Sequence, residues 1–154
     1  MTVDDVAGAF DLDRFSRALV EHISDAILYA GKDGLISYWN AGAERIFGFS
    51  AEEAVGQSLD LIIPPNLRKR HWDGYEKTMR TGQTRYGSGD LLAVPALRKD
   101  GTRISVEFSM LPFFDEQARM IGIAAVLRDV TRNFETVKAL RRELAARSGA
   151  KHPL

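Results

Sequence analysis

Residues 36–48 have the sequence Ile-Ser-Tyr-Trp-Asn-Ala-Gly-Ala-Glu-Arg-Ile-Phe-Gly, and this stretch decides the fold. Its first half is a short run of β-forming residues, and a similar run, residues 26–30, precedes it. Between the two runs, Gly31-Lys-Asp-Gly34 contains the Asp-Gly pair that supplies a positive φ in a tight hairpin turn. The second half carries apolar residues around Glu44 and Arg45 at helical spacing. We therefore expect a β-hairpin followed by a short helix.

Further helices and strands follow this opening unit. Ser50-Ala-Glu-Glu53 fits a capping box, in which the serine and glutamate side chains satisfy backbone amides at the start of a helix. Pro64-Pro65 ends an apolar run, and a longer helix is expected over residues 66–80. The Thr81-Gly82 pair that follows should end this helix. Three β-runs complete the domain, at residues 90–97, 103–111 and 120–129. The second run alternates apolar and polar residues, so one face of the sheet should be core and the other exposed.

Amphipathic helices are expected on both sides of this unit. Apolar residues recur at three- and four-residue spacing over residues 11–23, and again over residues 132–147. We divide the chain accordingly into an N-terminal flanking helix (1–24), a central domain (25–131) and a C-terminal helix with a polar tail (132–154).

Composition excludes several classes of protein. Lys and Arg total 21, as do Asp and Glu, so no nucleic-acid partner is expected. The chain has no cysteine, which removes disulfides, thiolate metal sites, iron–sulfur clusters and a catalytic thiol. Its longest apolar stretch, residues 121–127, is far shorter than the roughly 20 residues that span a bilayer. No membrane helix, no secretory signal and no enzyme motif is found, and we expect a cytoplasmic protein without catalytic activity.

The order of elements and four short motifs resemble the PAS family of sensor domains. The motifs are residues 36–48, Ser50-Ala-Glu-Glu-Ala-Val-Gly56, Lys99-Asp-Gly101 and Arg128-Asp-Val-Thr131, and the resemblance covers roughly residues 15–131. It implies an α+β fold, with a five-stranded antiparallel sheet and a long helix that together hold a small ligand. The light-sensing branch that forms a flavin adduct requires a cysteine, so the absence of cysteine excludes that branch.

His71 is the most informative residue of the long helix. Leu67, His71 and Tyr75 follow one another at four-residue spacing, so the imidazole lies on the apolar stripe that faces the sheet. The pattern leaves two interpretations open. His71 is either a core histidine satisfied by one hydrogen bond or a residue that binds a ligand.

The segment Arg68-Lys-Arg-His71-Trp-Asp-Gly-Tyr75 is similar to the haem-binding branch of PAS proteins, which includes oxygen-sensing histidine kinases. In that branch the proximal histidine lies on this helix, after basic residues and shortly before a tyrosine, although some members have one residue fewer between the two. The resemblance implies haem b with His71 as the iron ligand. The other residues expected around the cofactor are Leu67, Tyr75, Leu92, Val94, Phe108, Met110, Ile123 and Ala125.

Two of these residues affect what the haem would bind. Oxygen-binding members place an arginine on the first strand after the long helix, and the corresponding residue here is Leu92. Without a donor at that position, bound O₂ loses a charge-assisted hydrogen bond, so CO or NO should be favoured. Met110 has two open roles, a sixth iron ligand or adaptable filling of the core.

Two functions therefore remain open. The first is a haem-based sensor that reports a diatomic gas (CO, NO or O₂) or a redox state to a separate output protein, such as a kinase, a cyclase or a regulator. The second is a haem-free PAS module that works through dimer contacts and binds an apolar metabolite or no ligand. In either case we expect a parallel homodimer built from both flanking helices and the exposed sheet face, since the apolar stripe of residues 134–144 needs a partner. The alternative is a monomer whose helices fold back on its own sheet.

Overall fold

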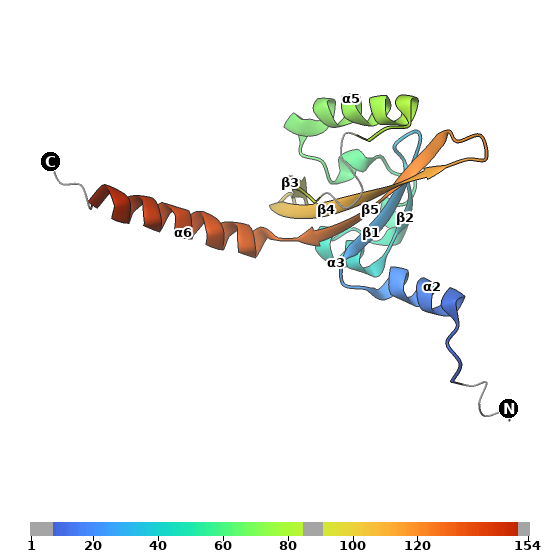
Figure 1. The fold of residues 1–154 in the computed structure, drawn as a ribbon, viewed down its shortest axis with the longest axis horizontal. Helices are drawn as coiled ribbons and strands as arrows, with labels where there is room; N and C mark the ends of the chain where they lie inside the picture. Colours follow the sequence, from blue (N-terminus) through green and yellow to red (C-terminus); the bar gives the residue numbers. More distant parts are fainter. Residues whose placement is uncertain (1–7, 85–90, 151–154) are drawn as a thin grey trace.

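The computed structural model describes residues 8–84 and 91–150 of the chain. Five strands form one antiparallel sheet in the order β2-β1-β5-β4-β3. The strands are β1 (Ala26–Gly31), β2 (Ile36–Trp39), β3 (Leu92–Leu97), β4 (Arg103–Phe114) and β5 (Met120–Asp129). The helices are α2 (Leu12–His22), α3 (Ala41–Phe47), α4 (Ala51–Ala54), the 3-10 turn η1 (Leu59–Leu61), α5 (Pro65–Thr81) and α6 (Thr131–Ala150). The predicted five-stranded α+β fold is confirmed (Figure 1).

Asn40 organises the start of the domain. Its side-chain oxygen caps α3 by accepting a hydrogen bond from the Ala43 amide at 2.8 Å, and it also accepts one from the Ile27 amide at 2.8 Å. Its amide nitrogen donates to the carbonyl oxygens of Val20 and Asp25. Asn40 is only 2% exposed, so this one buried side chain joins α2, β1 and α3.

The capping box predicted at Ser50 is also present. The Ser50 hydroxyl accepts a hydrogen bond from the Glu53 amide at 3.1 Å, and the Glu53 carboxylate accepts one from the Ser50 amide at 3.0 Å. The predicted turn at Lys99-Asp-Gly101 lies between β3 and β4, and Gly101 there has φ +85°. Local sequence signals thus place these features correctly.

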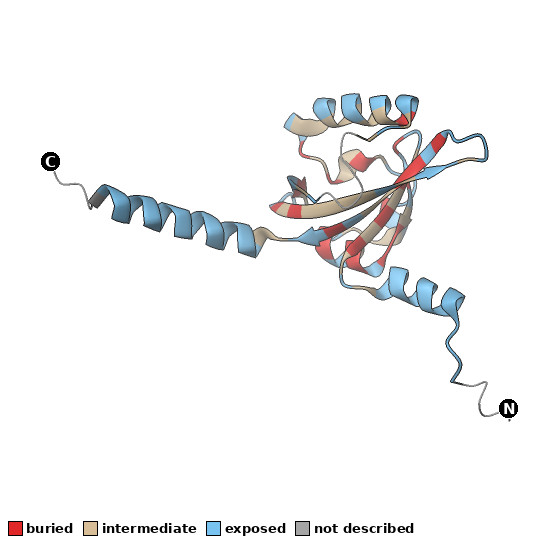
Figure 2. Ribbon diagram, viewed as in Figure 1, coloured by how far each residue is buried: buried red, intermediate tan, exposed pale blue. Residues whose placement is uncertain are grey.

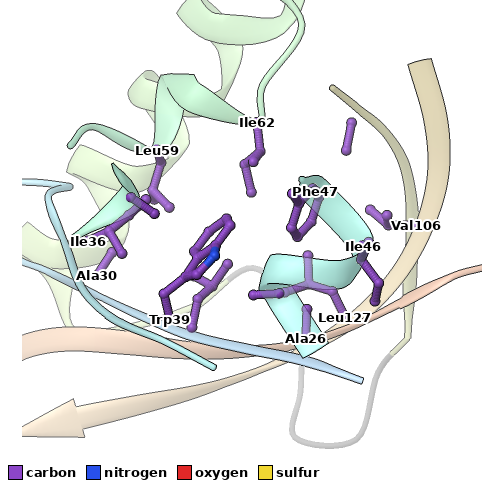
Figure 3. Packing of buried hydrophobic residues seen from close by; sticks show 14 of the residues in the cluster. Ala26, Ala30, Ile36, Trp39, Ile46, Phe47, Leu59, Ile62, Val106 and Leu127 are labelled. Carbon is purple, nitrogen blue, oxygen red and sulfur yellow. The ribbon is translucent and has the colours of Figure 1, made fainter. Parts of the chain in front are cut away.

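The hydrophobic core lies between one face of the sheet and the short helices α3, α4 and η1. Figure 3 shows Trp39, Phe47 and Leu127 packed together in it. The Trp39 and Phe47 ring centroids are 5.4 Å apart. Phe47 has no exposed surface, and the Trp39 indole donates a hydrogen bond to the Phe49 carbonyl oxygen at 3.0 Å. This core anchors the short helices to the sheet face on which the candidate site lies.

Most helix and strand boundaries agree with the sequence prediction within three residues. The predicted helices at 11–23, 66–80 and 132–147 correspond to α2, α5 and α6. The run predicted over 103–111 is longer in the structure, because β4 continues to Phe114. The start predicted for β3, at Asp90, lies outside the described residues.

The two flanking helices lie away from the core. α2 has no buried residue, and the described part of α6 is exposed except at its first residue (Figure 2). α6 extends away from the sheet, so it does not fold back over the strands of its own chain (Figure 1). No helix within the described ranges is long and apolar enough to cross a membrane.

Candidate functional site

Helix α5 carries the candidate site and packs over the sheet along one strand. At its start, the Asn66 side-chain oxygen accepts a hydrogen bond from Arg103, the first residue of β4, at 2.9 Å. At its end, the cap residue Gly82 has φ +70° and lies beside Phe114, the last residue of β4. The helix therefore runs along β4, and its half-buried stripe faces the sheet as predicted.

His71 lies in the middle of this stripe. Its Nδ1 atom is buried and has no hydrogen-bond partner in the part of the chain that the structure describes. The imidazole packs edge-on against Trp72, with ring centroids 4.7 Å apart, and its centroid is 5.7 Å from that of Tyr75. Burial lowers the pKa of His71 below its ordinary value, while the charge of Asp60 opposes this shift. The ring is therefore neutral near pH 7 and has a nitrogen lone pair available for a ligand.

Two neighbouring side chains fix the position of His71. The Trp72 indole nitrogen donates a hydrogen bond to the Asp60 carboxylate at 2.7 Å, and the ring packs so closely on Gly34 that a Cβ there would lie 2.3 Å from it. The Tyr75 hydroxyl donates to the Gly31 carbonyl oxygen at 2.6 Å. These contacts tie α5 to η1, to β1 and to the β1–β2 turn.

The sequence analysis did not identify Trp72 or Asp60. Trp72 follows His71 on the helix and widens the apolar stripe. This position was the only sign in the sequence that Trp72 belongs to the site. Its partner lies 12 residues earlier in the chain, and the turn that it packs on lies further still. Such partners are set by the tertiary fold, so periodicity on one helix does not reveal them.

The sheet residues predicted around the cofactor lie in two zones. Tyr75 and Met110 pack against a buried cluster that contains Ile123, and Phe108 and Ala125 pack against the main core. Among the described residues, Leu92, Val94 and Leu67 belong to neither cluster.

The β3 residues are nevertheless on the same side of the sheet as the clusters. Leu92 pairs with Phe108 and Val94 pairs with Val106, so these side chains share one face. Val94 is still 39% exposed, although Val106 opposite it is buried. The structure thus brings His71 and Tyr75 together over the inner face, and it leaves apolar surface on β3 uncovered.

These features fit a haem. Its iron needs only one or two ligands from the protein, and His71 offers a neutral imidazole with a buried nitrogen that has no partner among the described residues. Apolar side chains on the facing sheet would cover the macrocycle. Within the described ranges there is no group of three or more His, Cys, Asp or Glu that could hold a metal ion.

Comparison with known proteins identifies the family. Residues 14–130 match the family model described as the PAS fold. The chain is 33% identical over 94 residues to the sensor protein FixL of Bradyrhizobium diazoefficiens, which covers 61% of this chain and 18% of FixL. It is 28% identical over 96 residues to the oxygen sensor protein DosP of Escherichia coli, which covers 62% of this chain and 12% of DosP. The chain thus spans less than a fifth of the length of these curated relatives.

Solved structures agree with this match. A PAS domain from Colwellia psychrerythraea superposes with a TM-score of 0.68 at 24% identity, covering 79% of this chain and 99% of that domain. An RNA-binding light-oxygen-voltage receptor superposes with a TM-score of 0.67 at 19% identity, covering 96% of this chain and 41% of the receptor. At these identities the superpositions show a shared fold. The family match over residues 14–130 and the five-stranded sheet together establish that the chain belongs to the PAS family of signal-sensing domains.

Proposed function

We propose that this PAS domain binds haem b through His71 and reports a diatomic gas or a redox state to a signalling partner. The observation that carries the proposal is the buried Nδ1 of His71, which finds no hydrogen-bond partner among residues 8–84 and 91–150. It lies on a helix that faces apolar strands. A buried polar atom without a partner is costly, and coordination to a metal removes that cost. A histidine kept only for packing would be expected to use its nitrogen in a hydrogen bond.

The relatives support the same proposal. One is named a sensor protein and another an oxygen sensor protein, and each matches more than half of this chain. A flavin adduct is not proposed, because the chain has no cysteine to form one.

The protein groups around the site would set what it senses. When bound, the haem iron supplies the position at which a diatomic gas binds or an electron is exchanged. His71 holds its nitrogen unprotonated because burial lowers its pKa. Leu92, Phe108 and Met110 present no N–H or O–H side-chain donor, so the pocket should favour CO or NO over O₂.

An absorption spectrum tests the haem proposal. Protein purified from haem-sufficient cells should show a Soret band that shifts when reduced protein receives CO. His71→Ala should abolish haem retention or make the spectrum heterogeneous, whereas His22→Ala, on exposed α2, should leave it unchanged. A colourless preparation, or an unchanged His71→Ala spectrum, would overturn the proposal. Colourless protein would favour the haem-free module, for which the uncovered apolar surface on β3 is the specific observation.

We also propose that two copies assemble as a parallel homodimer and pass the signal to a separate output protein. The apolar stripe of α2 (Leu12, Phe15, Leu19) is exposed, and so is that of α6 (Phe134, Val137, Leu140, Leu144). The outer face of the sheet adds exposed Leu111, Phe113 and Val126. Exposed apolar surface of this kind marks an interaction site. A change in the sheet on ligand binding would move α6, because α6 begins two residues after β5.

A further inference from the structure

A second cleft lies at the C-terminal half of α5, beside the β1–β2 turn and the β4–β5 turn. Its volume is about 670 Å³, within the range of small-molecule sites. His71, Leu92, Val94, Phe108 and Met110 do not line this cleft, so it is separate from the proposed haem site. Tyr75 is shared between the two sites.

Four aromatic and methionine residues among the lining are here called the floor of the cleft: Trp72, Tyr75, Met79 and Met120. Met79 and Met120 are 7% and 2% exposed. The Trp72 indole nitrogen is bonded to Asp60 and the Tyr75 hydroxyl to Gly31, so both rings offer only carbon surface to a ligand. The two methionine side chains adapt readily to the shape of an apolar group.

Charged side chains of both signs surround this floor. They are Lys32 and Asp33 on the β1–β2 turn, Glu76 and Arg80 on α5, and Arg119 in the β4–β5 turn. Arg119 is occupied, since it forms an ion pair with Asp115 at 3.0 Å and a hydrogen bond with Gln117.

The other four rim charges, Lys32, Asp33, Glu76 and Arg80, are free of ion pairs among the described residues, although one Asp33 carboxylate oxygen accepts a hydrogen bond from the Leu35 amide at 3.0 Å. Within residues 8–84 and 91–150 none of them forms an ion pair, although Glu76 and Arg80 lie at the four-residue spacing that favours one. The β1–β2 turn and α5 therefore each contribute one basic group and one carboxylate to the lining. An anionic ligand would meet two carboxylates, and a cationic ligand would meet two basic groups, whereas a ligand with both charges can pair with each kind.

We propose that this cleft binds a zwitterionic small molecule with an apolar body, of the class of an aromatic amino acid. Its carboxylate pairs with Arg80 or Lys32, its ammonium group pairs with Glu76 or Asp33, and its ring lies on Tyr75, Met79 and Met120. The site goes beyond the proposed haem function and does not depend on it.

Calorimetric titration of the full chain with three matched probes tests the proposal. L-phenylalanine carries both charges, 3-phenylpropionate only the carboxylate and 2-phenylethylamine only the ammonium group. L-phenylalanine should bind about tenfold or more tightly than either single-charge probe, because each lost partner removes a charge-assisted hydrogen bond. Heat reports this binding whether or not haem is present, so its failure is distinguishable from failure of the haem proposal.

Variants of the rim locate the site. Arg80→Gln and Glu76→Gln should each weaken L-phenylalanine binding about tenfold or more, while Arg70→Gln, an exposed arginine of α5 that does not line the cleft, should not. 3-Phenylpropionate should lose affinity only in Arg80→Gln, which removes the partner of its carboxylate. 2-Phenylethylamine should lose affinity only in Glu76→Gln, which removes the partner of its ammonium group. Absence of binding heat with L-phenylalanine, equal affinity for the three probes, or an equal loss in Arg70→Gln would overturn the proposal.

Discussion

The hydroxyl of Tyr75 donates a hydrogen bond to the carbonyl oxygen of Gly31 at 2.6 Å, and this bond ties the centre of α5 to the last residue of β1. A weaker contact, at 3.3 Å, reaches the Ala30 carbonyl oxygen. Burial, with the charge of Asp33 nearby, raises the pKa of Tyr75 above its ordinary value, so the hydroxyl remains a donor over the working pH range. Because His71 lies one helical turn before Tyr75, this bond also fixes where the imidazole is held.

Tyr75→Phe should lower the free energy of unfolding by about 1 kcal/mol, the usual net contribution of such a bond. The loss should be no larger, because the Gly31 carbonyl oxygen also accepts a hydrogen bond from the Gly34 amide at 2.9 Å and stays satisfied. Urea denaturation of the native protein and of Tyr75→Phe measures this difference in the free energy of unfolding. Tyr38→Phe is the matched control, since the Tyr38 hydroxyl makes no hydrogen bond within the described part of the chain. Equal losses in the two variants would contradict the assigned role of Tyr75.

Replacing two helical glycines by alanine should change the free energy of unfolding in opposite directions. A Cβ on Gly42 of α3 would lie 2.0 Å from the backbone oxygen of Asp25, which cannot move aside without shifting β1. Gly42→Ala should therefore destabilise the fold by at least about 2 kcal/mol. A Cβ on Gly74 of α5 would meet no atom of the described residues within 4 Å, so Gly74→Ala should stabilise the fold by up to about 1 kcal/mol. Denaturation midpoints that change in the same direction would contradict this pair of expectations.

The features that the sequence predicts well are those fixed by neighbouring residues. The Ser50–Glu53 capping box and the turn at Gly101 each depend on a few consecutive residues, and both are found. The start of the long helix is predicted at residue 66 and lies at Pro65, one residue earlier. The predicted run over residues 103–111 ends too early, because β4 continues through Pro112 to Phe114 although proline lacks a donor for a sheet ladder. The structure explains why the strand continues. Pairing between β3 and β4 reaches only Phe108, so within the described residues Pro112 has a strand on one side alone.

The candidate site was predictable only in part. Helical spacing was enough to place His71 and Tyr75 on the face of α5 that meets the sheet. Spacing carries no information on whether the imidazole nitrogen has a partner, because that depends on residues distant in the chain. The same limit applies to the second cleft, whose walls come from Lys32, Arg80 and Arg119 in three separate segments.

Stability should depend on pH through His71. Burial lowers its pKa in the folded state, whereas the unfolded chain has the ordinary value of about 6.5. As the pH falls below that value, the unfolded state takes up the proton more readily, so the free energy of unfolding decreases. Above it the contribution of His71 is constant.

Denaturation of protein prepared without added haem, at about pH 7.5 and about pH 5.5, measures this effect. His71→Gln should lose part of the dependence on pH, and His22→Gln, on the exposed surface of α2, should keep all of it. Stability that rises on acidification in the native protein, or the same pH dependence in His71→Gln, would contradict the burial of a neutral imidazole.

The proposed homodimer depends on the exposed apolar stripes of the flanking helices. An isolated helix of the length of α6, 20 residues, has little stability in water unless its apolar side packs against a partner. Phe134 and Leu144 are 50% and 64% exposed within one chain, so burial against a second copy would remove apolar surface from water at both ends of the helix. Light scattering at micromolar concentration should therefore give twice the chain mass of 17.1 kDa.

Phe134→Glu and Leu144→Glu should each shift this equilibrium toward the monomer, because dimerisation would bury a carboxylate against an apolar partner. Thr136→Glu adds the same charge to α6 outside the apolar stripe and should leave the mass unchanged. The dimer model fails if the native protein is monomeric across micromolar concentrations. The model also fails if Thr136→Glu dissociates the dimer as strongly as Phe134→Glu and Leu144→Glu do. The assembly would then respond to the charge of the helix and not to its apolar stripe.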